Sequence, residues 1–328
     1  MGAEVGGFAL AEPVSAPSHW GLLKLSVTDT RGDIRDSNAI AAAIEKFKPE
    51  IVFHLAAQSL VRRSYKDPAT TWSTNVNGTI NILEACKSVK GLRAVVVATS
   101  DKCYENRSLA RGYRESDALG GHDPYSASKA AVELVVQSYR NASFANRQSP
   151  LVATVRAGNV IGGGDWSEDR LIPDLVRASA RRRPLKIRSP AATRPWQHVL
   201  EPLSGYLLLG QRLMAGDRAF ACPWNFGPSQ RGVCSVQELL TKIAHCWPDI
   251  IWKAQRGKHP LEALQLSLVS AKARSLLHWR PVWGLDRTVG ATADWYRHFL
   301  AHRTSISENQ LQLYWRDASR KKMLWTAD

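Results

Sequence analysis

No apolar run in this 328-residue sequence approaches the ~20 residues that a helix needs to cross a bilayer. The first residues, MGAE, supply neither the basic segment nor the apolar core of a secretory signal. Cysteine is scarce, and the five cysteines lack the paired spacing of a metal site. We therefore expect no membrane partner and no metal, and we predict a cytoplasmic protein whose thiols are reduced.

Clustered positive charge is also nearly absent, although the sequence is basic overall. Lys and Arg number 44 against 29 Asp and Glu, which gives a net charge of +15. A nucleic-acid-binding surface needs a basic stripe with interleaved aromatic residues, whereas only two short basic runs occur, at 181–183 and 320–322. We expect no nucleic-acid partner, and we interpret the excess charge as background with a modest role in steering an anion such as a nucleotide sugar.

Short β-branched runs alternate with amphipathic segments, which is typical of a parallel sheet with helices on both faces. The predicted strands are 3–10, 22–27, 50–55, 92–98, 151–156 and 224–226. The predicted helices are 37–47, 72–88, one that ends near 181, 199–213 and one that starts at Tyr125. We therefore predict an α/β fold with a doubly wound parallel sheet.

The character of the chain changes after Ala157, where glycines, prolines and tryptophans interrupt the alternation. Three consecutive glycines at 162–164 could cradle a phosphate, but no helix begins there and no lysine follows in the phosphate-loop position. We interpret them as a flexible loop at a domain border. The predicted main domain comprises 1–157 with about 199–228, and a smaller lobe comprises 158–198 and 229–328.

The stretch with the clearest chemistry follows the predicted strand 92–98. After Thr99, that strand is followed by Ser100, at the sheet edge where open α/β proteins carry their sites. Tyr125 and Lys129 are four residues apart and share one face of the next helix. A lysine cation there favours the tyrosinate, and the serine hydroxyl can hold a substrate oxygen. The combination predicts a proton relay for oxidising an alcohol, although each part alone also fits a surface pair or a turn residue.

Longer stretches carry a resemblance to a known family. They are GDIRD at 32–36, FHLAAQ at 53–58, TNV at 74–76, TSDKCYEN at 99–106, DPYSASK at 123–129, 156–166, 194–205 and 224–228. The sequence resembles the extended short-chain dehydrogenases/reductases of the NAD-dependent epimerase/dehydratase family, and more narrowly the CDP-glucose 4,6-dehydratases. The resemblance covers essentially the whole chain and implies a Rossmann-like fold and a hydro-lyase.

The resemblance implies a role for each residue of the central stretch. Tyr125 takes the proton of the sugar 4-hydroxyl while NAD accepts the hydride, Lys129 lowers the pKa of Tyr125 and holds the nicotinamide ribose, and Ser100 positions the 4-oxygen. Asp101 protonates the departing 6-hydroxyl. Lys102 lies where related dehydratases carry a carboxylate base for C5, and it acts either as a base or as a cation that stabilises the enolate.

The resemblance also implies the binding residues. The NAD contacts it implies are Asp33, Ile34, Leu55, Ala56, Ala57, Gln58 and Asn75, together with Tyr125 and Lys129. The residues it implies for CDP-glucose are Asn159, Arg170 and Arg194. Asp33 can also cap the helix that follows it, a role compatible with binding the cofactor, and any one of the arginines is by default a surface residue. A homo-oligomer that serves dideoxyhexose synthesis for lipopolysaccharide O-antigen is the expected context.

Two departures from the family pattern leave a second hypothesis open. The chain as given begins at what should be the second strand, so that the first strand and its G-x-x-G-x-x-G fingerprint for the NAD pyrophosphate are missing. Val269 stands where the family usually has aspartate. We expect weaker NAD binding than in a chain with the fingerprint. The alternative to an active dehydratase is an inactive remnant that binds a nucleotide sugar.

Overall fold

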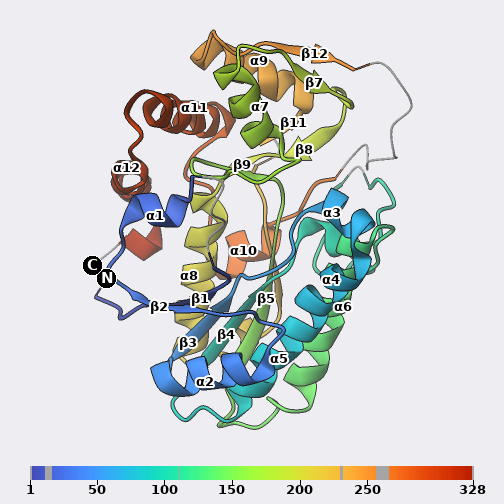
Figure 1. Cartoon of the computed structure of the whole chain (residues 1–328). Helices are drawn as coiled ribbons and strands as arrows, with labels where there is room; N and C mark the ends of the chain where they lie inside the picture. The colour runs from blue at the N-terminus through green and yellow to red at the C-terminus, as the bar shows by residue number, and fades with distance from the viewer. Residues whose placement is uncertain (1, 12–16, 110, 230–231, 256–265, 327–328) are drawn as a thin grey trace.

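The computed structural model of the chain describes residues 2–11, 17–109, 111–229, 232–255 and 266–326. Its main sheet has four parallel strands in the order β10-β5-β4-β3. These strands are β3 (Ile51–His54), β4 (Ala94–Ala98), β5 (Leu151–Ala157) and β10 (Pro223–Phe226). The predicted α/β fold with a parallel sheet is confirmed (Figure 1).

Helices cover both faces of this sheet because alternate strand residues point to opposite sides. Val95 and Val97 of β4 pack with one set of helices, whereas Ala94 and Val96 pack against another. The first set is α2 (Ser37–Phe47), α5 (Gly78–Lys87) and α6 (Pro124–Asn141), and the opposite face carries α8 (Leu200–Met214) and α10 (Ala271–Leu276). All residues of β4 up to Val97 are fully buried, which explains why this strand is apolar throughout.

A second, two-stranded parallel sheet lies beside the first. It pairs β1 (Gly6–Ala9) with β2 (Thr28–Arg31), joined through α1 (His19–Leu23). The predicted strand 22–27 is wrong, because Ser18 caps a helix there and the second strand begins only at Thr28. Within the described residues no backbone ladder joins this pair to β3.

The segment between β3 and β4 forms a bent helical run rather than one helix over 72–88. It consists of α3 (Val61–Lys66), α4 (Pro68–Trp72), a π-helical turn at Ser73–Asn77 and α5. Asp67 ends α3 and caps α4 by accepting the backbone N–H of Thr70. The π turn is a common feature of functional sites because it redirects one side chain inside a helix, and here it contains Asn75.

A lobe lies beyond the carboxyl ends of the main strands (Figure 1). It contains β6 (Val160–Ile161), α7 (Leu171–Ala180), β7 (Leu185–Ile187), β8 (Thr193–Pro195), β9 (Gln197–His198), β11 (Val233–Ser235), α9 (Val236–Cys246), β12 (Trp252–Ala254), α11 (Leu285–His302) and α12 (Ser307–Arg320). Its core is rich in aromatic residues, including Trp196, Trp247 and Trp295. Although α10 falls in the range predicted for the lobe, it packs on β10 of the main sheet.

No described helix combines the length and the apolar character that a membrane span requires.

The glycines at 162–164 have a packing role. A Cβ on Gly163 would overlap the indole ring of Trp295, and Gly164 has φ +82° and lies against the ring of His19. The predicted flexible loop is therefore packed against α1 and α11. The glycines are needed because the backbone approaches two rings too closely for any side chain.

Gly163→Ala is accordingly expected to lower the free energy of unfolding by about 1–3 kcal/mol, since the indole of Trp295 must move. Gly290→Ala, inside α11 with open space around its Cβ, is the matched control. It is expected to raise stability by about 0.5–1 kcal/mol, because alanine favours the helix. Thermal melts of the two variants measure both effects, and equal stability of Gly163→Ala and the parent would contradict this packing role.

Candidate active site

The segment after β4 brings three polar side chains together at the carboxyl edge of the sheet. Ser100 caps the short 3₁₀ turn Asp101–Cys103 by accepting the backbone N–H of Lys102 at 3.2 Å. Asp101 is only 1% exposed, and its Oδ1 accepts from Ser100 Oγ and from Lys102 Nζ, each at 3.0 Å. Its Oδ2 is buried and has no hydrogen-bond partner among the described residues. A buried carboxylate oxygen without a donor is costly unless a ligand supplies one.

The first turns of α6 place Tyr125 and Lys129 at the same edge. The helix begins at Pro124, and Asp123 caps it by accepting the backbone N–H of Ser126. Both predicted residues are buried. Lys129 Nζ donates to the carbonyl of Ala98 at 3.0 Å, which fixes the lysine to the end of β4. The structure thus brings the Tyr–Lys pair and the Ser100–Lys102 segment to one site.

The charge balance at Tyr125 differs from the expectation in one respect. Burial raises the pKa of Tyr125, and the two influences that oppose this most are the Lys102 cation and a hydrogen bond with Ser100. The sequence pattern assigned the role of lowering this pKa to Lys129, whereas in the structure Lys102 is the cation with the largest effect. Burial also lowers the pKa of Lys129, to about 8.

Two of the predicted cofactor residues, Gln58 after β3 and Asn75 in the π turn, hold the site together. Asn75 accepts the backbone N–H of Gln58 at 2.8 Å, donates to its carbonyl at 3.1 Å and donates to Ser128 Oγ at 2.8 Å. The side chain of Gln58 bonds to the backbone of Leu60 and to Thr71. Asn75 therefore ties the π turn to both the end of β3 and α6.

The remaining predicted cofactor residues follow β3 and, in the second sheet, β2. Ala56 and Ala57 are half-buried, whereas Leu55 is 53% exposed. At the end of β2, the Asp33 carboxylate pairs with Arg35, which lowers the pKa of Asp33. The alternative role of Asp33 as a helix cap is wrong, because Asp36 caps α2. The next residue, Ile34, is buried in the core beneath α5.

Of the predicted substrate residues, Arg170 is the one whose charge acts on a predicted catalytic residue, Tyr125. It precedes α7, donates to Ser59 Oγ at 2.9 Å, and its charge opposes the rise that burial causes in the pKa of Tyr125. Asn159 and Arg194 lie in the lobe, Asn159 beside β9 and Arg194 within β8. The Oδ1 atom of Asn159 is buried without a partner in the described chain.

Three residues near the site were not predicted. Tyr206 of α8 is buried, and the charges of Tyr125 and Asp101 add to the effect of burial in raising its pKa. Glu133 of α6 and Arg156 of β5 form a fully buried ion pair at 2.7 Å behind the catalytic segment. Two signals could have revealed that pair: Glu133 lies two helical turns after Tyr125, and Arg156 interrupts the apolar run LVATVRA.

The parallel sheet and the Ser–Tyr–Lys arrangement at its carboxyl edge define an extended short-chain dehydrogenase/reductase. The model of the GDP-mannose 4,6 dehydratase family matches residues 21–292, and the chain belongs to this family.

Individual relatives agree with that assignment. A CDP-glucose 4,6-dehydratase of Salmonella typhimurium is 47% identical over 307 residues, which covers 92% of this chain and 85% of the relative. A UDP-glucose 4-epimerase structure from Thermotoga maritima has a TM-score of 0.77 at 20% identity, covering 91% and 92% of the two chains. A dTDP-glucose 4,6-dehydratase structure from Streptomyces venezuelae, with NAD bound, has a TM-score of 0.74 at 24% identity, covering 90% and 88%. The two structures support the fold.

Proposed function

We propose that this chain is a CDP-glucose 4,6-dehydratase, a hydro-lyase that converts CDP-D-glucose to CDP-4-dehydro-6-deoxy-D-glucose and water with bound NAD. The identity with the Salmonella enzyme over most of both chains supports the substrate and the reaction. The observation that carries the proposal is the buried Oδ2 of Asp101, which has no hydrogen-bond partner in the described part of the chain and lies beside Ser100 and Lys102. An oxidoreductase that used only the Ser–Tyr–Lys relay has no need of a buried acid there.

The nicotinamide end of NAD fits the described residues. Lys129 uses one of its three donors on the Ala98 carbonyl, which leaves two that can hold ribose hydroxyls. The small side chains of Ala56 and Ala57 permit close approach at the end of β3. For the pyrophosphate, the described residues contain no glycine-rich turn that leads from a strand of either sheet into a helix. When bound, NAD supplies the acceptor for the C4 hydride and returns that hydride to C6.

In this proposal, Tyr125 and Ser100 act in the oxidation of C4. Ser100 positions the 4-oxygen, and Tyr125 takes the hydroxyl proton as the tyrosinate. The Lys102 cation and the Ser100 hydrogen bond favour that tyrosinate, opposing the larger effect of burial, which raises the pKa of Tyr125. The resulting 4-keto group makes the C5 proton acidic, which prepares the loss of water.

Elimination then falls to Asp101 and Lys102. In this step Asp101, almost fully buried, acts as the carboxylic acid: it donates its proton to the departing 6-hydroxyl, and the proton released from C5 replaces it. Lys102 Nζ donates to Asp101 Oδ1 at 3.0 Å, and in this proposal the ammonium stabilises the enolate that forms when the C5 proton leaves. Arg170 and Arg194 are proposed to bind the pyrophosphate of the nucleotide sugar, since an arginine fork matches phosphate oxygens, with Asn159 nearby.

Lys102→Met tests the electrostatic role of Lys102. Removing the cation raises the pKa of Tyr125, so less tyrosinate is present at neutral pH and the acidic limb of the kcat/KM profile moves to higher pH. Partial recovery of activity at alkaline pH is therefore expected. Lys66→Met, on exposed surface of α3, is the matched control. A uniform loss of activity at every pH would instead favour Lys102 as the C5 base.

The proposal is tested by incubating the protein with NAD and CDP-glucose, dTDP-glucose or UDP-glucose in parallel. The expected result is a 4-keto-6-deoxy product, detected by NMR, formed from CDP-glucose in preference to the other two. Binding of CDP-glucose without turnover at saturating NAD would favour the inactive remnant. As part of this proposal, the protein is a homo-oligomer in the cytoplasm, and residues 1–157 with about 199–228 form its cofactor domain. Its product serves dideoxyhexose synthesis for lipopolysaccharide O-antigen.

A further inference from the structure

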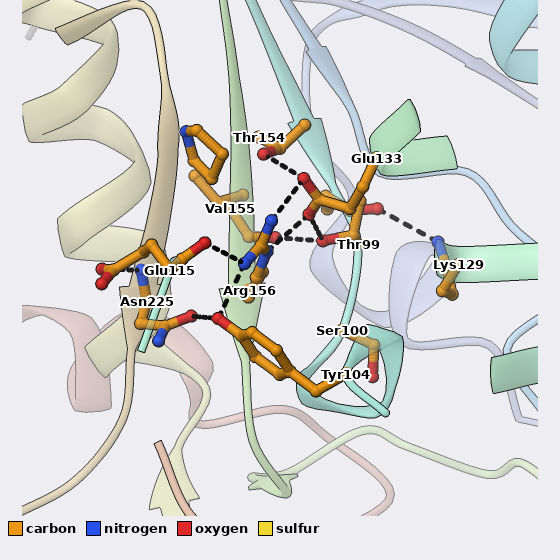
Figure 2. A network of polar contacts seen from close by, with 12 residues as sticks. Thr99, Ser100, Tyr104, Glu115, Lys129, Glu133, Thr154, Val155, Arg156 and Asn225 are labelled. Atoms are coloured by element: carbon orange, nitrogen blue, oxygen red, sulfur yellow. Dashed lines mark hydrogen bonds and ion pairs between the residues drawn. The ribbon is translucent and has the colours of Figure 1, made fainter. Parts of the chain in front are cut away.

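A bidentate ion pair is buried behind the catalytic segment (Figure 2). Glu133 Oε1 accepts from Arg156 Nε at 2.7 Å, and Oε2 accepts from Arg156 Nη2 at 2.8 Å. Two threonine hydroxyls also donate to the Glu133 carboxylate. Thr99 Oγ1 donates to Oε1 at 2.6 Å, and Thr154 Oγ1 donates to Oε2 at 2.7 Å. Although burial alone raises the pKa of Glu133, these partners lower it below its ordinary value, so the pair is ionised.

The Glu133–Arg156 pair is hydrogen-bonded to both ends of the catalytic segment, Thr99–Tyr104. Thr99, directly before Ser100, is bonded to Glu133 as described above. At the other end, Arg156 Nη1 donates to Tyr104 Oη at 2.7 Å, and Tyr104 Oη donates to Asn225 Oδ1 at 2.7 Å. The Arg156 guanidinium also lies 4.9 Å from the centre of the Tyr104 ring. The segment with Ser100, Asp101 and Lys102 is thus fastened at 99 and at 104 to the same two charges (Figure 2).

Stability alone does not account for this arrangement. Removing two charges from water is so unfavourable that apolar residues of similar volume are often equally stable or more so. We propose that the Glu133–Arg156 pair is a positioning element of the dehydratase, which acts through the Thr99–Tyr104 segment and through Lys129 and does not touch the substrate. The inference rests on the proposed function, whose catalytic residues the pair positions.

The second way in which the pair acts on the site is through the charge of Lys129, which precedes Glu133 by one helical turn. The charge of Glu133 raises the pKa of Lys129, opposing the larger effect of burial, whereas burial raises the pKa of the neighbouring Cys103 thiol, which is therefore uncharged at assay pH. His54 on β3 also faces Lys129, but burial lowers the pKa of His54 to about 3, so it is neutral at assay pH. Loss of the Glu133 charge therefore lowers the pKa of Lys129 below about 8. Lys129 then becomes neutral at lower pH.

Thr99→Val and Thr154→Val form a matched pair that tests the segment route. Each removes the hydroxyl bond to Glu133 with little change of shape; Thr99→Val also removes a longer 3.3 Å contact with the Val155 carbonyl, and only Thr99 adjoins Ser100. Similar losses of melting temperature are expected for the two variants, with kcat about tenfold lower in Thr99→Val than in Thr154→Val. Equal kcat values at equal stability would overturn the proposal that the bond positions the segment.

The double variant Glu133→Gln/Arg156→Gln tests the Lys129 route without leaving an unpaired buried charge. The alkaline limb of its kcat profile is expected to move to lower pH by about one unit, while Thr154→Val leaves that limb in place. An unmoved limb would overturn this route. NMR titration of the lysine side chains, with Lys129 assigned through Lys129→Gln, follows the same shift without substrate. Failure of the wild-type protein to dehydrate CDP-glucose would refute the proposed function. The titration needs no substrate, so it still shows whether the charge of Glu133 changes the pKa of Lys129.

Discussion

Tyr125→Phe is expected to reduce kcat by ~10²–10⁴-fold, the usual contribution of a positioned general base. The phenylalanine ring fills the same buried space, so the loss comes from the missing hydroxyl and not from packing. Binding of CDP-glucose is expected to change little, because the proposed pyrophosphate contacts are made by Arg170 and Arg194. Steady-state kinetics together with a calorimetric titration of CDP-glucose separate the two effects.

Tyr139→Phe is the control for this variant. It makes the same chemical change on the same helix, where Tyr139 bonds to Glu84 outside the catalytic site. Its kcat is expected to stay within about twofold of the parent, as for most surface substitutions. Normal turnover in Tyr125→Phe would assign the proton transfer to another group, and Tyr206, which is electrostatically coupled to Tyr125, is the first candidate.

Asp101→Asn is expected to stop the loss of water while oxidation at C4 and release of the C5 proton continue. An amide keeps the size of the buried side chain and can still accept from Ser100, but it cannot protonate the 6-hydroxyl. Dehydrated product is expected to fall by ~10²–10⁴-fold. In D₂O the recovered CDP-glucose is expected to gain deuterium at C5, which NMR detects, because the 4-keto sugar forms and returns to the starting alcohol.

Glu105→Gln serves as the control for this charge change. It is four residues further along the chain, where the exposed carboxylate pairs only with Arg107 among the described residues. Its turnover is expected to match that of the parent. Absence of both C5 exchange and dehydration in an Asp101→Asn protein that melts normally would place Asp101 in the oxidation step, contrary to its proposed role in elimination.

Much of the main sheet follows from local sequence. The run that forms β4 is fully buried on both faces, so it is apolar without interruption and easy to recognise. Tyr125 and Lys129 were located from their spacing and from the Pro124 start of the helix, and the structure puts them beside Ser100 at one edge. Such features depend on neighbours in the chain, which a sequence displays directly.

The features that sequence did not reveal depend on partners distant in the chain. Residues 22–27 have the composition of a strand, but a cap at Ser18 turns 19–23 into a helix. Lys102 has the largest cationic effect on Tyr125 because the turn after β4 folds it toward α6, which spacing cannot indicate. The Glu133–Arg156 pair joins a helix to a strand 23 residues away, so neither charge alone predicts its partner.

The most direct test of the dehydratase assignment follows the hydrogen on C4. The protein is incubated with NAD and CDP-glucose that carries deuterium at C4, and the product is analysed by mass spectrometry and NMR. The expected product is one water lighter than the substrate and carries the deuterium at C6, because the hydride removed from C4 is returned within the same site. A product that keeps its water, such as a 4-epimer, or unchanged CDP-glucose at saturating NAD would contradict the assignment.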